Sequence, residues 1–258
     1  MAIRQQKSYK ILVIGDACLD EYHFGSCERL SPEAPVPIFK RIRHESKQGM
    51  CLNVASNLKS LGHSVHVDKN IEKIKKIRLI DKKSNHHILR IDDEPDIKSV
   101  DIRKYTRKSM IGFDALVISD YDKGYIRHGD ILDIIEPARF IGIPIFVDSK
   151  KRDLSKFEEC IIKINEKENE LVTELPQNSE VIVTYGKNGA IWNSKIFSAN
   201  QSEMHDVCGA GDVFLAGLVH KYLETSGDLE KSIVFANKCA SISVSHFGTY
   251  TIKKEDLS

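Results

Sequence analysis

The sequence predicts an α/β fold in which a mainly parallel sheet lies between two layers of helices. Three observations lead to this fold. Short apolar runs rich in β-branched residues recur along the chain, segments of helical length separate them, and polar residues gather just after the runs end. Strands that alternate with helices favour parallel pairing, with helices on both faces of the sheet.

The length and composition fit one domain. A chain of 258 residues is long enough for one large α/β domain, which we expect to span residues 1–258. Its 38 Lys and Arg residues nearly balance 37 Asp and Glu residues, so we expect no nucleic acid and no membrane as a partner. Residues 1–10 are polar and basic, and no apolar run has the length of a membrane span or signal-peptide core, so we expect a cytoplasmic protein.

The cysteines are scattered and predict free thiols. They show neither the close pairs of a zinc site nor the density of a disulfide scaffold. We therefore expect no structural metal or disulfide at these positions: Cys18, Cys27, Cys51, Cys160, Cys208 and Cys239.

The first predicted strand is the apolar run 11–14, which stops at Gly15 and Asp16. Open parallel sheets bind ligands outside the carboxyl ends of their strands. Asp16, and Asp20 a few residues later, are therefore candidates for substrate binding. A turn cap is the alternative for these acids.

Two later segments predict irregular β structure and one helix. Residues 22–43 contain three prolines, which predict an extended segment that leads into an edge strand and could cover a site. Residues 71–80 and 86–92 flank a polar turn and predict a hairpin. Residues 52–62 predict an amphipathic helix that ends at a glycine. Asn53, near its start, could bind sugar hydroxyls or be only a polar first-turn residue.

From residue 97 the pattern becomes regular. The expected elements are helix 100–109, strand 115–119, helix 129–141, strand 145–148, strand 161–164, helix 166–174, strand 181–184, a hairpin through 190–192 and helices over 228–245. Polar residues gather after these strands, which predicts one long crevice at a single edge of the sheet. They are Asp120, Lys123, Asp148, Asn165, Glu168, Thr184 and Gly186.

The stretch 205–212 carries the strongest chemical signal. Two glycines around Ala210 permit a tight turn with uncovered N–H groups, and the apolar run 213–219 predicts a buried helix behind it. Bare N–H donors at a helix N-terminus suit a phosphoryl group, and Asp212 could accept the proton of an attacking hydroxyl. An ordinary glycine-rich turn with a capping acid is the alternative.

These motifs stand in a recognisable order. They are Gly15-Asp16 with Asp20, Gly49 with Asn53, Asn165-x-x-Glu168, Thr184-Tyr185-Gly186, Asp206-x-x-Gly209-Ala210-Gly211-Asp212, and Asn237. Over nearly the whole chain the set resembles the ribokinase-like (PfkB) carbohydrate kinases. Within that family, residues 29–37, 89–92 and 119–124 look like the kinase domain of the D-glycero-β-D-manno-heptose 7-phosphate kinases.

The resemblance implies a fold and an activity. The fold would be a ribokinase-like three-layer α/β/α arrangement with a small β lid from about residues 20–45 and 76–93. The reaction would transfer the γ-phosphoryl group of ATP, with Mg²⁺, to the anomeric hydroxyl of a heptose 7-phosphate. The partner would be this small-molecule sugar phosphate, and a homodimer through the lid is also implied.

The resemblance also implies roles for individual residues. Asp212 would be the base, and the anion hole would be formed by Gly209, Ala210 and Gly211. Glu168 and Asn165 would hold the magnesium through water. The nucleotide would meet Asn165, Thr184, Gly186, Asn237 and Gly248. The sugar would meet Asp16, Asp20, Gly49 and Asn53. Candidates for the acceptor's own phosphate are Arg29, Arg90 and Lys123, because Arg and Lys bind phosphate well.

The chain departs from the family pattern at several points. Met50 replaces a second glycine beside Gly49, Cys208 stands where a small polar residue is usual, and the chain is short after Val67.

A Rossmann dehydrogenase and a Walker-type kinase are excluded because their glycine motifs are absent. Two alternatives remain: a PfkB kinase for a different sugar, and a non-catalytic sugar-phosphate or nucleotide-binding protein derived from such a kinase. The retention of Asp212 counts against the second.

Overall fold

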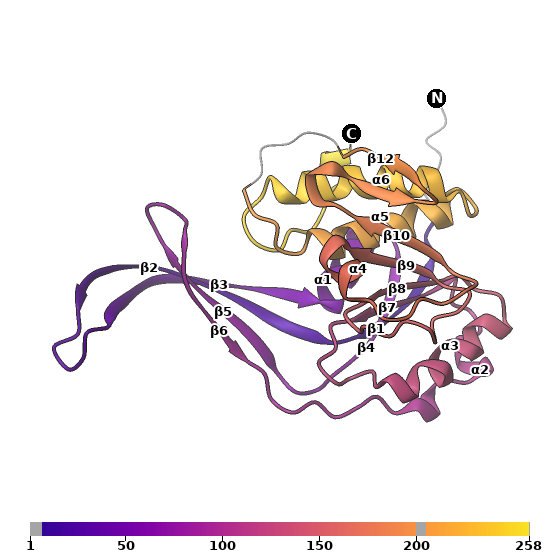
Figure 1. Ribbon diagram of the computed structural model, residues 1–258, viewed down its shortest axis with the longest axis horizontal. Coiled ribbons are helices and arrows are strands. Elements are labelled where there is room, and N and C mark those ends of the chain that lie inside the picture. The colour runs from indigo at the N-terminus through magenta and orange to yellow at the C-terminus, as the bar shows by residue number, and fades with distance from the viewer. Residues whose placement is uncertain (1–6, 200–204, 258) are drawn as a thin grey trace.

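The chain folds around an eight-stranded central sheet (Figure 1). The computed structural model describes residues 7–199 and 205–257. The strands of the central sheet run in the order β12-β11-β10-β9-β8-β7-β1-β4. Their bounds are β1 Lys10–Gly15, β4 Ser64–Lys69, β7 Ala115–Asp120, β8 Ile145–Ser149, β9 Ile161–Asn165, β10 Glu180–Thr184, β11 Ala190–Trp192 and β12 Lys195–Phe197.

Pairing in the central sheet is mainly parallel, as predicted. Along the sheet, β4, β1, β7, β8, β9 and β10 pair in parallel, whereas the pairs β10–β11 and β11–β12 are antiparallel. The carboxyl ends of the parallel strands therefore meet at one edge of the sheet, which is where the predicted site residues follow them.

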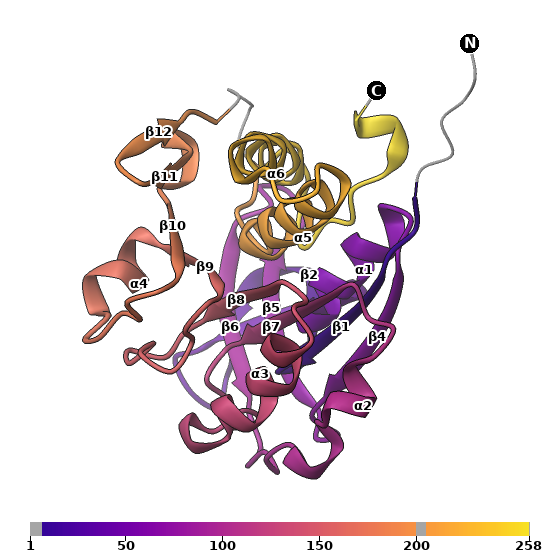
Figure 2. The same ribbon diagram turned by 90° about the vertical axis from the view of Figure 1, so that its right-hand side faces the viewer.

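Helices cover both faces of this sheet (Figure 2). One face carries α1 (Cys51–Ser60), α5 (Ala210–Glu224) and α6 (Leu229–Val244), and the other carries α2 (Arg107–Met110) and α3 (Ile131–Phe140). The short helix α4 (Glu166–Leu171) follows β9. Short 3₁₀ turns are η1 (Ile102–Lys104), η2 (His128–Asp130), η3 (Gly186–Asn188) and η4 (Lys254–Leu257). The predicted three-layer α/β/α architecture is confirmed.

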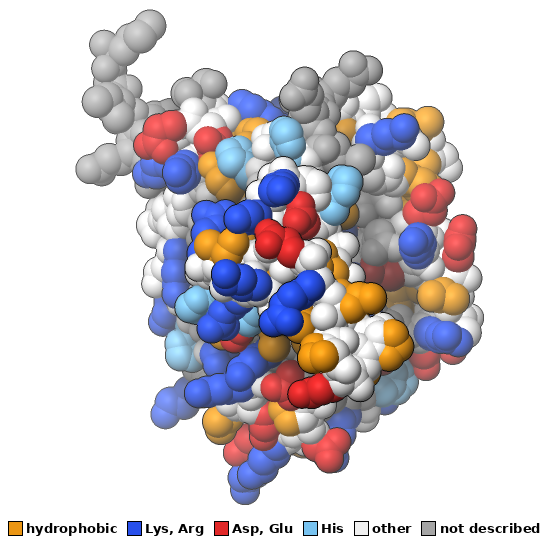
Figure 3. Space-filling model, turned by 90° about the vertical axis from the view of Figure 1, so that its left-hand side faces the viewer, with side chains coloured by type: hydrophobic (Ala, Val, Ile, Leu, Met, Phe, Trp, Pro, Cys, Tyr) orange, Lys and Arg blue, Asp and Glu red, His pale blue; other side chains and the backbone are white. Residues whose placement is uncertain are grey.

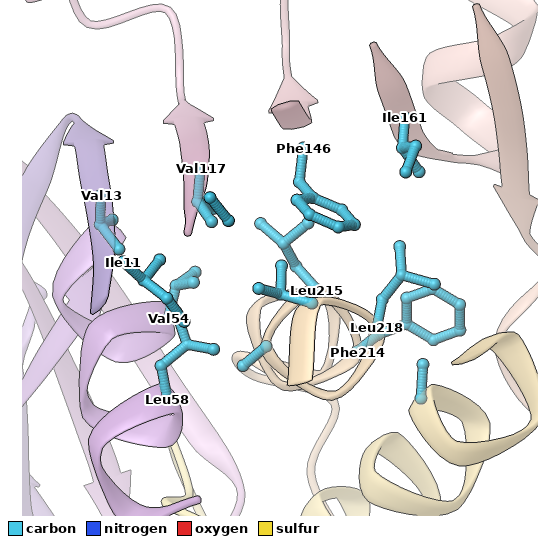
Figure 4. Packing of buried hydrophobic residues seen from close by; sticks show 14 of the residues in the cluster. Ile11, Val13, Val54, Leu58, Val117, Phe146, Ile161, Phe214, Leu215 and Leu218 are labelled. Carbon is cyan, nitrogen blue, oxygen red and sulfur yellow. The ribbon is translucent and has the colours of Figure 1, made fainter. Parts of the chain in front are cut away.

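Helix α5 is the centre of the core on its face of the sheet. Its Leu215 and Leu218 are fully buried and pack against Val117 and Phe146 of the strands, with Val54 of α1 alongside (Figure 4). An apolar helix buried on nearly all sides is held firmly by this packing. The N-terminus of α5 therefore has a fixed position at the carboxyl edge of the sheet.

A second sheet projects from the body and is called here the arm sheet (Figure 1). It has the order β3-β2-β5-β6, with β2 Ala17–Leu30, β3 Pro37–Met50, β5 Ile74–Asp81 and β6 His87–Asp93. Two predictions are confirmed here, because β5 and β6 form the expected hairpin and β3 is an edge strand that begins at the third proline, Pro37. The expected lid segments, about 20–45 and 76–93, lie in this sheet.

The arm sheet is joined to the C-terminal part of the chain. Phe247 packs against Tyr22 and Phe24 of β2, with ring centroids 5.8 and 5.6 Å apart. The ammonium of Lys47 on β3 donates to the carbonyl oxygens of Phe247, at 2.9 Å, and Thr249, at 3.0 Å. These contacts fix the base of the arm beside the N-terminus of α5.

Three predictions of local structure were wrong or incomplete. The predicted helix 100–109 is broken into η1 and α2, because Tyr105 between them is extended and its buried hydroxyl donates to Asp68 at 2.8 Å. The side chain of Thr106 then caps the new helix. Helix α4 ends at Leu171 rather than 174, and the 14-residue strand β2 was not predicted over most of its length.

No helix among residues 7–199 and 205–257 is long and apolar enough to cross a membrane. The described cysteines are free, as predicted.

Candidate active site

The N-terminus of α5 forms the predicted cradle of backbone N–H groups. Gly209 precedes the helix with φ +75°, a left-handed conformation that favours glycine, and no side chain of residues 7–199 or 205–257 caps the first turn. A Cβ atom on Gly209 would lie 2.6 Å from the amide nitrogen of Asn53, and one on Gly211 would lie 2.7 Å from the ammonium of Lys163. A side chain at residue 209 would be strained by this backbone conformation, and one at residue 211 would displace the ammonium of Lys163. The free N–H groups suit an anion.

Asp212 lies in the first turn of α5 and is 2% exposed. Its Oδ1 accepts a hydrogen bond from the hydroxyl of Tyr121 at 2.7 Å, and its Oδ2 accepts one from the side-chain amide of Asn53 at 3.0 Å. Burial raises the pKa of Asp212 to about 6, and the two hydrogen bonds oppose this rise. A carboxylate with this pKa can take a proton near neutral pH.

Four charged side chains form a network beside the cradle. The ammonium of Lys163 donates to Asp148 at 2.7 Å, and these side chains are 2% and 1% exposed. Lys150 lies 3.4 Å from the other oxygen of Asp148 and also pairs with Glu168. Burial alone would raise the pKa of Asp148, but Lys163 and Lys150 lower it below its usual value. The network places two cations and two carboxylates beside the cradle.

Sequence reasoning gave no role to Tyr121, Lys150 or Lys163. A signal existed for Lys163, which is a lysine inside the otherwise apolar run Ile161 to Ile164. Lysine is almost never fully buried without a partner. Tyr121 lay inside the stretch 119–124, but its contact with Asp212 joins residues 91 positions apart and leaves no local pattern.

Asp16 is fully buried and organises a loop. Its carboxylate accepts hydrogen bonds from the backbone N–H groups of Tyr121, Lys123 and Tyr125, at 2.8, 3.2 and 3.3 Å. Burial raises the pKa of Asp16, and these hydrogen bonds oppose the rise. The structure thus gives Asp16 a capping function for the loop after β7, and its role in sugar binding stays a prediction.

Asp20 and Gly49 lie side by side at the base of the arm sheet. Asp20 is 4% exposed and forms an ion pair of 2.6 Å with Arg78 of β5. A Cβ atom on Gly49 would lie 2.2 Å from a carboxylate oxygen of Asp20, so only glycine fits there. Met50 adopts φ +57° and ψ −133°, and its side chain packs with Cys18 and Ile74. Met50 thus adopts a backbone conformation that glycine would adopt more easily, at a cost of roughly 1–3 kcal/mol.

The predicted magnesium and nucleotide residues gather at the ends of β9 and β10. Asn165 caps α4 and donates from its amide to Glu168 at 2.6 Å, while Glu168 also binds Lys150. Thr184 is the partner of Asn165 across the parallel pair, and Gly186 follows with φ +55°. These four residues are therefore brought together, although their roles remain predictions.

Asn237 and Gly248 lie elsewhere. The side-chain amide of Asn237 is buried and donates to the carbonyl oxygen of Phe197 at 2.8 Å, at the end of β12. The N–H of Gly248 donates to Asp206 at 3.0 Å, and a Cβ atom on Gly248 would lie 2.9 Å from the ring of Tyr22. The turn at Gly248 therefore packs against the arm sheet, and its contact with the nucleotide stays a prediction.

The three candidates for the acceptor's phosphate are separated. Arg29 lies on the exposed end of β2, Arg90 pairs with Asp92 on β6 at 2.7 Å, and Lys123 pairs with Glu94 at 2.7 Å. Lys and Arg side chains gather on the end of the molecule where the arm projects (Figure 3). Exposed residues of β3 in this region include Lys40, Arg41 and Arg43. The arm is thus basic, and Lys123 alone belongs to the body.

Magnesium fits this site only as an ion bound mainly by water and phosphates. Within the part of the chain that the structure describes, no group of three His, Cys, Asp or Glu side chains could hold a metal by itself. Mg²⁺ usually keeps several waters and binds one or two carboxylates plus substrate phosphates. Asn165 and Glu168, which point to the same edge, provide such a donor set.

Comparison with known proteins assigns the C-terminal half of the chain to a family. Residues 133–256, which include the cradle, Asp212 and the Asn165–Glu168 pair, match the family model described as pfkB family carbohydrate kinase. The chain carries a PfkB carbohydrate kinase domain. The ribokinase-like family predicted from the ordered motifs is thereby confirmed.

Curated relatives align with nearly the whole PfkB chain. It is 29% identical over 309 aligned positions to the "Bifunctional protein HldE" of Haemophilus influenzae (strain PittEE), covering 97% of this chain and 63% of that protein. It is 30% identical to the protein of the same name from Campylobacter jejuni (strain RM1221), covering 99% of this chain and 65% of that protein. The chain therefore spans somewhat less than two thirds of these relatives.

Solved structures share the fold of this PfkB domain. Phosphofructokinase-2 from Escherichia coli in complex with potassium superposes with a TM-score of 0.75 at 17% identity, covering 96% of each chain. Ribokinase from Arabidopsis thaliana complexed with ribose and ATP superposes with a TM-score of 0.69 at 15% identity, covering 97% of this chain and 98% of that one. The ribokinase-like fold is confirmed.

Proposed function

We propose that this PfkB domain transfers the γ-phosphoryl group of ATP to the anomeric C1 hydroxyl of D-glycero-D-manno-heptose 7-phosphate. The product would serve the synthesis of ADP-heptose and surface-polysaccharide precursors. One observation carries the proposal: Asp212, with its pKa raised by burial to about 6, lies in the first turn of a helix whose N–H groups are uncovered. This arrangement combines a base with an anion site.

The reaction follows from these positions. The oxygen of the acceptor hydroxyl attacks the γ-phosphorus while its proton passes to Asp212. The bond between the γ-phosphorus and the β,γ-bridging oxygen breaks, and ADP leaves with the electron pair. The N–H groups of residues 209–211 stabilise the charge on the phosphoryl oxygens during transfer. Asn53 and Tyr121 hold the carboxylate in position through their hydrogen bonds.

Asn165 and Glu168 are the residues that would hold Mg²⁺ through water. The ion would supply positive charge that offsets the negative charge of the phosphates. Lys150, paired with Glu168, adds a cation at the same edge of the sheet. Thr184 and Gly186, beside Asn165, support nucleotide binding at the ends of β9 and β10.

The heptose 7-phosphate acceptor rests on the resemblance of residues 29–37, 89–92 and 119–124 to the heptose kinase branch. The similarity to proteins named HldE over 97% of the chain supports the same branch. The arm sheet, whose base carries Asp20 and Gly49, would act as the lid over the sugar.

We also propose a homodimer through this lid. Ile91 and Leu89 of β6 pair with Ile77 and Leu79 of β5, so their side chains share one face of the arm sheet. Leu89 and Ile91 are 54% and 45% exposed. A second copy would cover this apolar face, and sedimentation velocity of the wild type against Leu89→Glu tests the assembly. A monomeric wild type would contradict it.

The kinase proposal is tested by ADP release with MgATP and a panel of acceptors: heptose 7-phosphate, hexose phosphates and free sugars. Asp212→Asn should lower turnover about a hundred- to ten-thousandfold, the usual contribution of a general base. The control is Asp228→Asn, which alters a half-buried acid that caps the N-terminus of α6 and should retain activity, because asparagine caps a helix as well as aspartate does. If another sugar is phosphorylated and heptose 7-phosphate is not, that sugar replaces heptose 7-phosphate as the proposed acceptor. Absence of turnover, with ligands still shifting the melting temperature, would favour a binding protein.

A further inference from the structure

A hollow of about 650 Å³ lies between the loop after β7 and the loop after β8. We call it the loop pocket. It is lined by Asp122, Lys123, Gly124, Ile126, Arg127, His128, Lys150, Lys151, Arg152 and Asp153. Both loops leave the carboxyl ends of neighbouring parallel strands, so the loop pocket opens at the same edge of the sheet as Asp212.

The loop pocket is strongly basic. Five Lys and Arg side chains and two Asp side chains line it. Lys123, Lys150 and Lys151 already pair with carboxylates. Within residues 7–199 and 205–257, the guanidinium groups of Arg127 and Arg152 form no ion pair with a carboxylate. These two groups are available to an anion from outside.

The walls of the loop pocket are fixed before any ligand binds. The ammonium of Lys151 is 7% exposed and lies 3.3 Å from Asp120 and 2.5 Å from Asp122. Asp122 adopts φ +55°, an uncommon conformation for a residue other than glycine, and this geometry accompanies its contact with Lys151. Asp16 holds the same loop through backbone N–H groups. An anion would therefore meet a site that needs little reordering.

Tyr121 and Lys150 connect the loop pocket to the base. The hydroxyl of Tyr121 lies 2.7 Å from Asp212, and the ammonium of Lys150, which lines the pocket, lies 5.2 Å from the centre of the Tyr121 ring. The pocket and the base are thus separated by about one tyrosine side chain. A sugar phosphate has a comparable extent, with a reactive hydroxyl at one end and a phosphate at the other.

We propose that the loop pocket binds the phosphate ester of the acceptor sugar, held by the guanidinium groups of Arg127 and Arg152. This inference rests on the proposed kinase function, because it assumes that the sugar hydroxyl lies at Asp212. Guanidinium groups bind phosphate with two parallel hydrogen bonds, and Lys123 adds a point charge. The loop pocket would then select phosphorylated over unphosphorylated acceptors.

The test uses the double variant Arg127→Gln/Arg152→Gln. KM and kcat are measured for heptose 7-phosphate, for the same heptose without phosphate and for ATP. We expect KM for the phosphorylated acceptor to rise about tenfold or more, with kcat and the kinetics of the free sugar little changed. Arg103→Gln is the control, since this arginine is 86% exposed and lies outside the pocket.

Other outcomes separate this inference from the proposed function. An unchanged KM for heptose 7-phosphate, in an active wild type, overturns the loop pocket but leaves the kinase intact. A rise in KM for ATP alone also overturns it and assigns the pocket to the nucleotide's phosphates. If the wild type phosphorylates no acceptor, calorimetry with heptose 7-phosphate decides: binding lost in the double variant supports the pocket, and binding absent or equal in both proteins overturns it.

Discussion

The hydroxyl of Tyr121 donates a hydrogen bond to Oδ1 of Asp212 at 2.7 Å, and Asn53 donates to the other carboxylate oxygen. The two donors come from the loop after β7 and from α1, so they hold the carboxylate from different sides. A hydrogen bond to the charged form of an acid lowers its pKa, whereas burial raises it. The pKa of Asp212, about 6, is the balance of these effects.

Removing the hydroxyl of Tyr121 should change the pH dependence of the reaction. In Tyr121→Phe the ionised form of Asp212 loses one hydrogen bond, so its pKa should rise by about one unit. The base must be ionised to act. As the pH is lowered, kcat/KM should therefore begin to fall at a higher pH than in the wild type, and it should recover in alkaline buffer. The measurement is the pH profile of kcat/KM.

The control for this experiment is Tyr105→Phe. Its hydroxyl donates to Asp68 at 2.8 Å, away from the cradle, so this variant should leave the pH profile in place. If the pH at which kcat/KM falls on the acid side of the profile is the same in Tyr121→Phe and the wild type, the tyrosine has only a packing role.

Asp212 should also lower the stability of the fold near neutral pH. Its pKa is raised above the value of 3.8 for an unfolded carboxyl, so the folded state binds the proton more tightly, and stability falls as pH rises through about 4 to 6. Asp212→Asn removes the buried charge but leaves one donor unpaired. We expect a net gain of about 1–2 kcal/mol at pH 8 and none at pH 4, from urea unfolding. A variant less stable than the wild type at pH 8 would contradict this.

The cradle could be predicted because its signal is local. Two glycines, an acid and an apolar run within a few residues are enough to indicate a helix N-terminus with uncovered N–H groups. The parallel strands were predictable for a similar reason, since each is a short apolar run between turn residues.

The surroundings of Asp212 could not be predicted from local patterns. Asn53 and Tyr121 reach it from 159 and 91 positions away. The break at Tyr105 has the same origin, because its contact with Asp68 overrides the helical pattern of residues 100–109. From the sequence, Asp16 could either cap a turn or bind substrate. The structure favours the capping role, because three backbone N–H groups of a loop more than 100 positions away donate to its carboxylate.

Adding a methyl group at Gly211 should disturb the charges beside the cradle. A Cβ atom there would lie 2.7 Å from the ammonium of Lys163, which would have to move away from Asp148. We expect Gly211→Ala to lower kcat about tenfold or more, because misplacing charge near the transferred group weakens catalysis. Gly129→Ala is the control, since among the described residues no atom beyond its two chain neighbours lies within 4 Å of its added Cβ. Equal activity in both variants would show that Lys163 moves without consequence.

Because Lys163 and Asp148 form a buried ion pair, the free energy of unfolding should depend on both side chains. Lys163→Met leaves the buried carboxylate of Asp148 with Lys150, at 3.4 Å, as its one ion-pair partner among the described residues. It should lower the free energy of unfolding by about 3 kcal/mol, measured with urea at pH 7.5. The double variant Lys163→Met/Asp148→Asn should recover part of this loss, because a neutral amide needs no cation. The cost of Lys163→Met should also shrink at acidic pH, since protonation removes the unpaired charge. A loss that is equal in the double variant and independent of pH would show that lost packing, rather than charge, explains the effect.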